Sequence, residues 1–135
     1  GTLISSARHL GVATVFFVAP TTREERLGLI TRSATGFIYY VSVAGVTGAR
    51  TVLPADILRH VRAVKQACQT PVCVGFGIST PEQIRTISRA ADGVIVGSAI
   101  IKEIEKHAGR STLVREVSRV VRDMASPLKA GEGRG

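Results

Sequence analysis

The sequence predicts an α/β fold built on a parallel β-sheet. Short apolar runs alternate with segments of helical periodicity along most of the 135 residues. The runs are apolar almost throughout, as in strands covered on both faces, whereas a strand with one wet face alternates apolar and polar residues. Three of the four runs also end in glycine-rich turns. Such alternation of strands and helices is typical of a parallel sheet with helices packed against it.

The first half of the chain contains two of these strands. Residues 12–19 (VATVFFVA) form an apolar, β-branched and aromatic run that Pro20 ends. The next residues, Thr22-Arg-Glu-Glu25, have the pattern of a capping box, so we expect a helix over residues 23–33 with Leu27 and Ile30 facing inward. The second strand covers residues 36–42 (GFIYYVS). A loop with glycines follows at residues 43–52.

The second half repeats the alternation. A helix over residues 54–68 begins at Pro54 and buries a stripe of Ile57, Leu58, Val61 and Val64. Strands are predicted over residues 71–75 and 93–97. Between them, the cap pattern Thr80-Pro-Glu-Gln83 opens a helix that runs to Ala91. Helices are expected over residues 98–106 and 111–125, the latter burying Leu113, Val114, Val117, Val120, Val121 and Met124. We expect one domain over residues 1–128 and a disordered tail over residues 129–135.

Composition excludes several classes of protein. Hydrophobic residues make up 44% and charged residues 21%, so the chain can form a core. No apolar run approaches the roughly 18–20 residues of a membrane span, and no signal-peptide pattern opens the chain, so we expect a cytoplasmic protein without membrane contact. Cys68 and Cys73 are too few for a disulfide framework and are expected to be small buried hydrophobes.

The charge balance leaves nucleic-acid binding as a weaker hypothesis. Eighteen Lys and Arg against ten Asp and Glu give a net charge of +8. The basic residues are scattered, however, and aromatic residues make up only 4%, so neither a basic cluster nor a stacking platform forms. We therefore expect no nucleic-acid partner. A steep dependence of DNA or heparin retention on salt would contradict this.

The ends of the predicted strands indicate a phosphate site. In parallel α/β proteins, ligands bind beyond the carboxyl ends of the strands. There the chain has Gly75-Phe-Gly77 and Gly97-Ser98, and the second turn opens a short helix. Glycines let backbone N–H groups approach an anion, and a helix N-terminus adds unpaired N–H groups and a positive dipole end. The alternative is that these glycines serve turn geometry alone.

Groups for acid–base catalysis are not found at that edge. The carboxylates up to residue 100 fall in first turns of helices or, for Asp92, just before a strand. His9, His60 and His107 fall on helices and share no metal-ligand spacing. Tyr39 and Tyr40 point to opposite faces of a strand, so one of them can face the ligand. We take this to be Tyr39, although core packing explains the residue equally well.

Three segments of the chain carry a family resemblance: residues 39–48 (YYVSVAGVTG), 75–83 (GFGISTPEQ) and 92–102 (DGVIVGSAIIK). In their order and spacing, they together resemble the tryptophan synthase alpha chain family. The resemblance implies the C-terminal half of a TIM (β/α)8 barrel, strands five to eight with their helices. A complete barrel takes about 250 residues. Together with a first residue that is not Met, this suggests a fragment of a longer protein.

The resemblance also implies an activity and a set of site residues. The family cleaves indole-3-glycerol phosphate, a phosphate ester, to indole and glyceraldehyde 3-phosphate in tryptophan biosynthesis. Indole then passes to the beta chain, a partner that holds pyridoxal phosphate, whereas the alpha chain needs no cofactor or metal. By motif, Gly75, Phe76, Gly77, Gly97 and Ser98 hold the phosphate together with Gly48. Tyr39 lines the indole pocket, and Thr47 lies on the loop that closes the site.

The family's catalytic Glu and Asp belong to the second strand and the loop after it, which this chain lacks. The resemblance therefore implies a fragment that is inactive alone and binds phosphate weakly. A four-stranded part of a barrel has two open edges and an uncovered inner face, so we expect aggregation, dimerisation of half-barrels or dependence on a missing N-terminal piece. The alternatives are a non-catalytic phosphate-binding half-barrel module and, less well supported, another phosphate-binding barrel enzyme.

Overall fold

The structure is a computed structural model and describes residues 2–41, 55–75 and 77–129. In this part of the chain, four strands form one parallel sheet in the order β1-β2-β3-β4. The strands are β1 (Phe16–Val18), β2 (Ile38–Val41), β3 (Val72–Gly75) and β4 (Gly93–Ile95). Six helices accompany them in this part: α1 (Thr2–His9), α2 (Glu24–Ser33), α3 (Ala55–Gln66), α4 (Pro81–Ile87), α5 (Ser98–His107) and α6 (Leu113–Lys129). The α/β class and the parallel sheet are confirmed.

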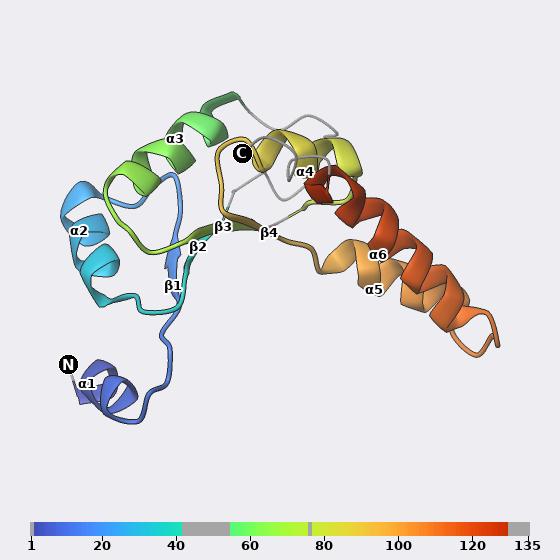
Figure 1. Cartoon of the computed structure of the whole chain (residues 1–135), viewed down its shortest axis with the longest axis horizontal. Coiled ribbons are helices and arrows are strands. Elements are labelled where there is room, and N and C mark those ends of the chain that lie inside the picture. The colour runs from blue at the N-terminus through green and yellow to red at the C-terminus, as the bar shows by residue number, and fades with distance from the viewer. Residues whose placement is uncertain (1, 42–54, 76, 130–135) are drawn as a thin grey trace.

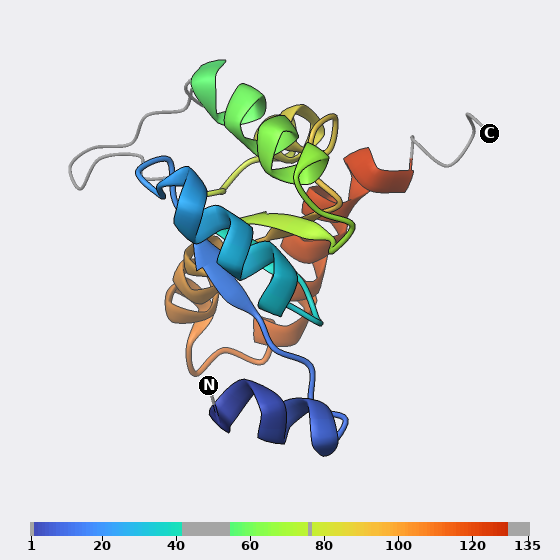
Figure 2. The same cartoon turned by 90° about the vertical axis from the view of Figure 1, so that its left-hand side faces the viewer.

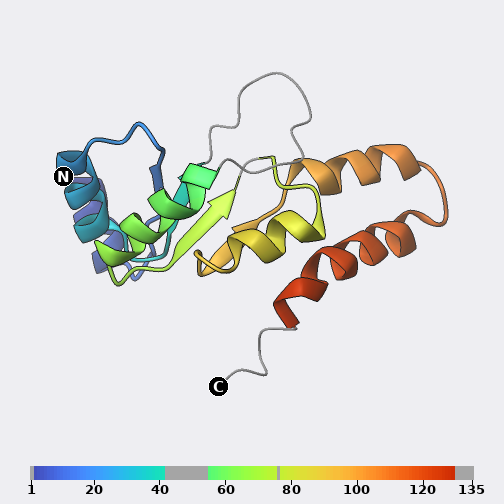
Figure 3. The same cartoon turned by 90° about the horizontal axis from the view of Figure 1, so that it is seen from above.

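Helices α2, α3 and α4 lie along one side of the sheet, and α5 and α6 form a pair beyond β4 (Figure 1). Seen from above, α5 and α6 run side by side in opposite directions (Figure 3). The core lies between this helical layer and the sheet. The sheet contributes Val18, Ile38, Tyr40, Val72 and Val74 to it, and the helices contribute Ile30, Ile57, Val61, Val64, Ile84, Ile87 and Met124.

The opposite face of the sheet is only partly covered by the described residues. Phe17, Tyr39, Cys73 and Gly93 are register partners across the four strands, so they share this face. Phe17 is 65% exposed, and its ring lies 5.1 Å from that of Tyr39. The expectation that the first strand is buried on both faces is therefore wrong. Only one face of β1 is covered by the described residues.

Strand β1 is also shorter than predicted, because residues before Phe16 find other partners. Thr14 accepts a hydrogen bond from the Gly36 N–H (3.0 Å), and its own N–H donates to the Thr35 hydroxyl (2.9 Å). These bonds join the entries of β1 and β2 before ladder pairing starts. Val12 and Val15, which the sequence assigns to the strand, are exposed.

The two predicted capping boxes behave differently. At α4, the Thr80 hydroxyl accepts from the Gln83 N–H (3.3 Å) and the Gln83 side chain accepts from the Thr80 N–H (3.1 Å), so this box is confirmed. At α2, the Thr22 hydroxyl instead accepts from the Ala19 N–H (2.9 Å), in the turn that follows β1. The helix begins one residue later, and its N-cap Arg23 makes no side-chain cap bond.

Helix α6 differs from its prediction in its exposed face and its end. Val114 is 75% exposed and Val121 is 43% exposed, whereas Met124 is buried, because α4 and α5 cover only one side of the helix. The helix continues through Pro127 to Lys129. Pro127 has no N–H, and the Ser126 hydroxyl donates to the Asp123 carbonyl instead (2.7 Å). Residues 130–135, the rest of the predicted tail, lie outside the described residues.

Some elements, in contrast, end earlier than predicted. Helix α4 ends at Ile87 instead of Ala91, because the chain must turn so that the Asp92 N–H can donate to the Val72 carbonyl (2.9 Å). The Asp92 carboxylate accepts from the Val72 N–H (2.9 Å) and from Lys65 on α3 (2.7 Å). Asp92 thus joins β3, α3 and the start of β4 at the amino end of the sheet.

Helix α1 buries none of its residues, and Leu3 is 81% exposed. It lies apart from the sheet and the helical layer (Figure 2). The Arg8 guanidinium donates to the Arg32 carbonyl at the end of α2 (3.0 Å). None of the helices in the described ranges combines the length and hydropathy that a membrane span requires.

Candidate functional site

The carboxyl ends of β3 and β4 bring two of the predicted phosphate turns to one edge of the sheet. Gly75, the last residue of β3, is the register partner of Ile95, the last residue of β4. Because the strands are parallel, the turns that contain Gly77 and Gly97 both leave from this edge. The sheet thus gathers these two turns in the region where parallel α/β proteins bind ligands.

Position 77 requires glycine because of its backbone conformation. Its φ is +74°, in the left-handed region that side chains disfavour, and a Cβ there would meet nothing within 4 Å. The residue is exposed, while the neighbouring Ile78 is buried and anchors the turn to the core. The turn therefore presents open backbone at the ligand edge.

Gly97 and Ser98 form the start of α5, a helix of ten residues. Gly97 is the N-cap, and no side chain caps the N–H groups of the first turn. The Gly97 carbonyl accepts from the N–H groups of Ile100 (2.9 Å) and Ile101 (3.1 Å), while Gly97 and Ser98 are exposed. Free N–H groups and the positive end of the helix dipole are suited to an anion.

Tyr39 and Gly75, two of the predicted site residues, are in contact. The Tyr39 ring lies over Gly75 so closely that a Cβ on Gly75 would collide with the Tyr39 hydroxyl and would lie 2.7 Å from its Cζ. Position 75 therefore requires glycine, because the Tyr39 ring leaves no room for a side chain. The contact brings the Tyr39 hydroxyl toward the carboxyl end of β3, whereas Tyr40 points into the core on the other face.

Three predicted site residues, Thr47, Gly48 and Phe76, lie outside the described residues. Among the described carboxylates before α5, Asp92 sits at the amino end of the sheet, and the others are in first turns of helices. In this part of the chain, no group of three or more His, Cys, Asp and Glu side chains has the geometry to hold a metal ion.

His107 and the two cysteines lie in structural surroundings. His107 ends α5 and pairs with Glu103 (2.9 Å). Cys68 and Cys73 are free and half-buried, and burial raises the pKa of both thiols, which makes them weak nucleophiles near neutral pH.

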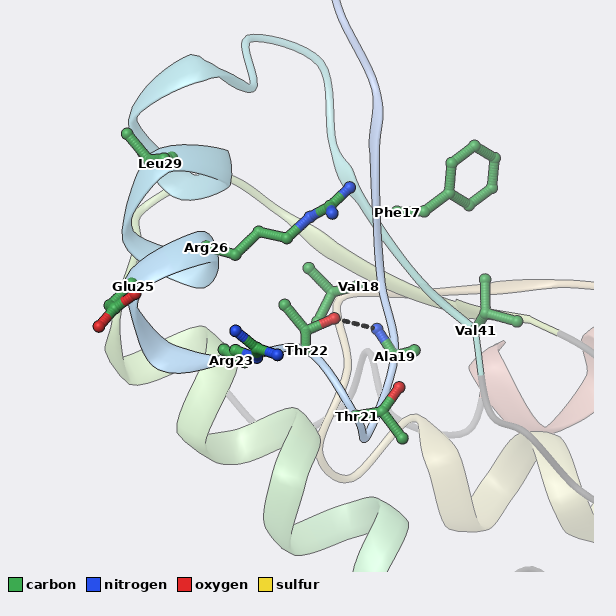
Figure 4. Close-up of a pocket in the computed structure, with 10 residues that line it drawn as sticks. All are labelled: Phe17, Val18, Ala19, Thr21, Thr22, Arg23, Glu25, Arg26, Leu29 and Val41. Carbon is green, nitrogen blue, oxygen red and sulfur yellow. Dashed lines mark hydrogen bonds between the residues drawn. The ribbon is translucent and has the colours of Figure 1, made fainter.

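A cavity beside β1, the first strand in the sheet order, was not expected from sequence. It has a volume of about 610 Å³ and lies against β1 and the start of α2. Two arginines, Arg23 and Arg26, contribute to its walls (Figure 4). In the sequence, Arg23 and Arg26 are visible as two basic residues that flank Glu24 and Glu25. That they lie beside the apolar strand β1 becomes apparent only in the folded chain.

A parallel sheet with glycine turns and a helix start without a side-chain cap at its carboxyl edge is typical of parallel α/β proteins, in which that edge is the ligand-binding region. The family model described as "Tryptophan synthase alpha chain" matches residues 1–129. The chain belongs to the tryptophan synthase alpha chain family.

Relatives and solved structures support the assignment. The tryptophan synthase alpha chain of Geobacter sp. (strain M21) is 48% identical over 103 residues, which are 76% of this chain and 39% of the relative. That of Geotalea daltonii is 42% identical over 125 residues, 93% of this chain and 46% of the relative. The tryptophan synthase A-subunit from Pyrococcus furiosus superposes with a TM-score of 0.76 at 35% identity, covering 93% of this chain and 49% of that one. The chain thus spans less than half the length of these curated relatives.

Proposed function

We propose that this chain is the C-terminal half of a tryptophan synthase alpha chain, with its four strands as strands five to eight of the (β/α)8 barrel. The observation that carries the proposal is the family match over residues 1–129, combined with a parallel sheet of four strands in sequential order. A barrel of this type has eight parallel strands in about 250 residues. The match to about half of the Pyrococcus furiosus subunit supports the same division.

The role proposed for this half is to hold the phosphate of indole-3-glycerol phosphate. Backbone N–H groups of Gly77, Gly97 and Ser98 bind the dianion, aided by the dipole of α5. The exposure of these residues and the absence of a side-chain cap on α5 support this role. Gly75 brings Tyr39 to the same edge, where its ring contacts the indole. Thr47, Gly48 and Phe76 complete the site as predictions from the family motif.

The reaction proposed for the assembled enzyme is an aldol cleavage in the cytoplasm. The bond between the indole ring and the glycerol phosphate carbon breaks, which requires one group to protonate the ring and another to remove a hydroxyl proton. The glycine turns themselves, residues 75–77 and 97–98, contain no carboxylate, and the proposal assigns these two groups to the N-terminal half of the barrel. The indole then passes to a beta chain; one structural relative is a tryptophan synthase complex from Pyrococcus furiosus.

Indole release tests the catalytic part of the proposal. The 135-residue chain is mixed with indole-3-glycerol phosphate, and indole is measured by its absorbance after extraction. We expect no indole above the rate without protein. Indole formation should appear after the N-terminal half of a relative is added. Indole produced at an enzymatic rate by the chain alone would contradict the absence of catalytic carboxylates.

Phosphate binding tests the site itself. Titration with inorganic phosphate should shift the amide NMR signals of Gly77, Gly97 and Ser98, while that of Gly109, an exposed glycine with φ +73°, stays unchanged. Ser98→Asp places a negative charge at the site and should weaken binding at least tenfold. Ser111→Asp, just before α6, is the matched control. If phosphate binds but no complementing half restores indole formation, the chain is a non-catalytic phosphate-binding module instead.

A further inference from the structure

Gln83 on α4 is a polar side chain in the core. It is 5% exposed, and within the described ranges it is the only polar or charged residue that is buried. Burying an amide costs free energy unless its polar atoms form hydrogen bonds. The partners of this side chain therefore indicate why the position is polar.

The Gln83 side chain bonds to more than the helix cap. Its Oε1 accepts from the N–H of the N-cap Thr80 (3.1 Å), which is all that a capping box requires. The same oxygen accepts from the Ser79 N–H at a shorter distance (2.8 Å), and the Ser79 hydroxyl lies 3.5 Å from it. Ser79 precedes the N-cap and belongs, with Gly77 and Ile78, to the turn after β3. The additional bond therefore joins α4 to that turn.

The turn after β3 is held on both sides of Gly77. On one side it follows β3, which pairs with β2 and β4. On the other side, Ile78 is 2% exposed and Ser79 is bonded to Gln83. Gly77 itself is exposed and has a φ of +74°. The residue proposed to bind phosphate is thus the free part of a turn whose neighbours are fixed.

We infer that Gln83 is a positioning residue of the phosphate site, which holds the turn after β3 in the conformation that presents Gly77 to the anion. Glycine has the largest backbone freedom, so an anion that binds a loose glycine turn must also order it. A turn that is ordered beforehand binds more tightly. The same bonds commit the N–H groups of Ser79 and Thr80 to Gln83. This inference rests on the proposed function, because it adds a residue to the proposed phosphate site.

The first test uses the unchanged 135-residue chain and inorganic phosphate. Coupling between two events is reciprocal, so if the Gln83 bonds favour phosphate binding, bound phosphate favours those bonds. While the Gly77 amide signal shifts in NMR titration, we expect hydrogen exchange at Ser79 and Thr80 to slow at least about threefold. Exchange at Ser88, whose N–H donates to the Ile84 carbonyl at the other end of α4 (2.9 Å), should stay unchanged.

Three variants separate positioning of the turn from capping of the helix. Gln83→Met keeps the length of the side chain without its acceptor and should bind phosphate at least about fivefold more weakly. Thr80→Ala is the matched control: it removes the cap bond to the Gln83 N–H, leaves the Gln83 oxygen in place, and should bind within about twofold. Gln83→Glu keeps an acceptor, as Glu does in capping boxes. It should restore slow exchange at Ser79 and bind phosphate more tightly than Gln83→Met.

Thermal melts establish that each variant folds, and the exchange experiment on the unchanged chain decides the matter if Gln83→Met does not. Three results would overturn the inference alone: phosphate affinity that Gln83→Met retains, an equal loss in Thr80→Ala, or exchange at Ser79 that phosphate leaves unchanged while Gly77 shifts. The absence of any phosphate-dependent shift at Gly77 in the unchanged chain would instead overturn the proposed function, and this inference with it.

Discussion

Gly75 shows how one residue decides the geometry of the candidate site. The Tyr39 ring occupies the position where a Cβ would stand, so the glycine is required by contact with a ring. Gly77, two residues later, is required by its positive φ. Both glycines belong to one motif, yet they are required for different physical reasons. A side chain at position 75 would collide with Tyr39, and a side chain at position 77 would strain the backbone.

Gly75→Ala should therefore displace the Tyr39 ring. We expect a loss of about 1–3 kcal/mol in the free energy of unfolding, which is the usual cost of overpacking. Urea denaturation measures this loss, and the matched control is Gly28→Ala. A Cβ at Gly28, inside α2, lies at an ordinary 3.5 Å from Arg32, so this change should be neutral or stabilising. An equal loss in both variants would contradict the contact.

Tyr40 is the residue with the clearest pH dependence. Its hydroxyl is buried and has no hydrogen-bond partner among the described residues, and burial raises its pKa from 10.0 to about 12. The folded state therefore holds the proton more tightly than the unfolded state. The stabilisation from this proton is fully present below pH 10 and is lost as the pH rises toward about 12.

Tyr40→Phe should remove the loss of stability that Tyr40 causes as the pH rises above 10. Near pH 7 we expect a change between zero and a gain of about 1 kcal/mol in the free energy of unfolding, because the hydroxyl gains no partner on folding. Unfolding curves at pH 7 and at several values above pH 10 measure both effects. A clear destabilisation at pH 7 would mean that the hydroxyl has a partner.

At the scale of elements, two similar helix starts have different outcomes. Thr80 caps α4 reciprocally with Gln83, while Thr22 bonds to the Ala19 N–H in the preceding turn. Both sequences have the pattern of a capping box. What differs is the chain before the threonine, because at Thr22 the end of β1 offers an unpaired N–H within three residues. A local motif thus depends on what its neighbours leave unsatisfied.

Thr80→Ala should destabilise the start of α4. Loss of an N-cap side chain costs about 1 kcal/mol, and hydrogen exchange at the Gln83 amide should become faster. Thr22→Ala is the control: it should speed exchange at Ala19 and leave the first turn of α2 unchanged, since that turn has no side-chain cap. Faster exchange in α2 would show that Thr22 caps the helix in solution.

At the scale of the whole molecule, the two faces of the sheet differ in coverage. Helices bury one face completely at Ile38, Val72 and Val74, each 0% exposed, while Phe17 on the other face is 65% exposed. An exposed apolar face of this kind is typical of an interaction surface. The isolated chain is therefore expected to be less soluble than its net charge suggests.

Substitutions on the two faces should have opposite effects. Phe17→Ser should change the free energy of unfolding by no more than about 0.5 kcal/mol and should raise the solubility of the isolated chain. Ile38→Ala, on the covered face, should cost about 2–5 kcal/mol. Chemical denaturation and light scattering measure the two quantities. A large loss of stability in Phe17→Ser would show that the open face is covered in solution.

Sequence patterns predicted the order and type of the strands and of the helices after the first, because periodicity and turn residues act within a few neighbours. In the predicted helical stripe, Ile57, Val61 and Val64 are buried, whereas Leu58 is only partly buried. Asp92 lies just before β4, as expected. The same patterns identified the glycine turns at the carboxyl edge, although Thr47, Gly48 and Phe76 stay predictions.

The tertiary structure alone decided which apolar residues are covered, where strands end, and what Tyr39 contacts. Val114, Val121 and Phe17 match apolar patterns as well as their buried neighbours do, yet no described element lies over them. Burial and strand pairing depend on residues distant along the chain, and no local window contains that information. The class of fold is thus determined by local chemistry, whereas the exposure of Phe17 and the order of the strands in the described part of the chain depend on contacts between distant residues.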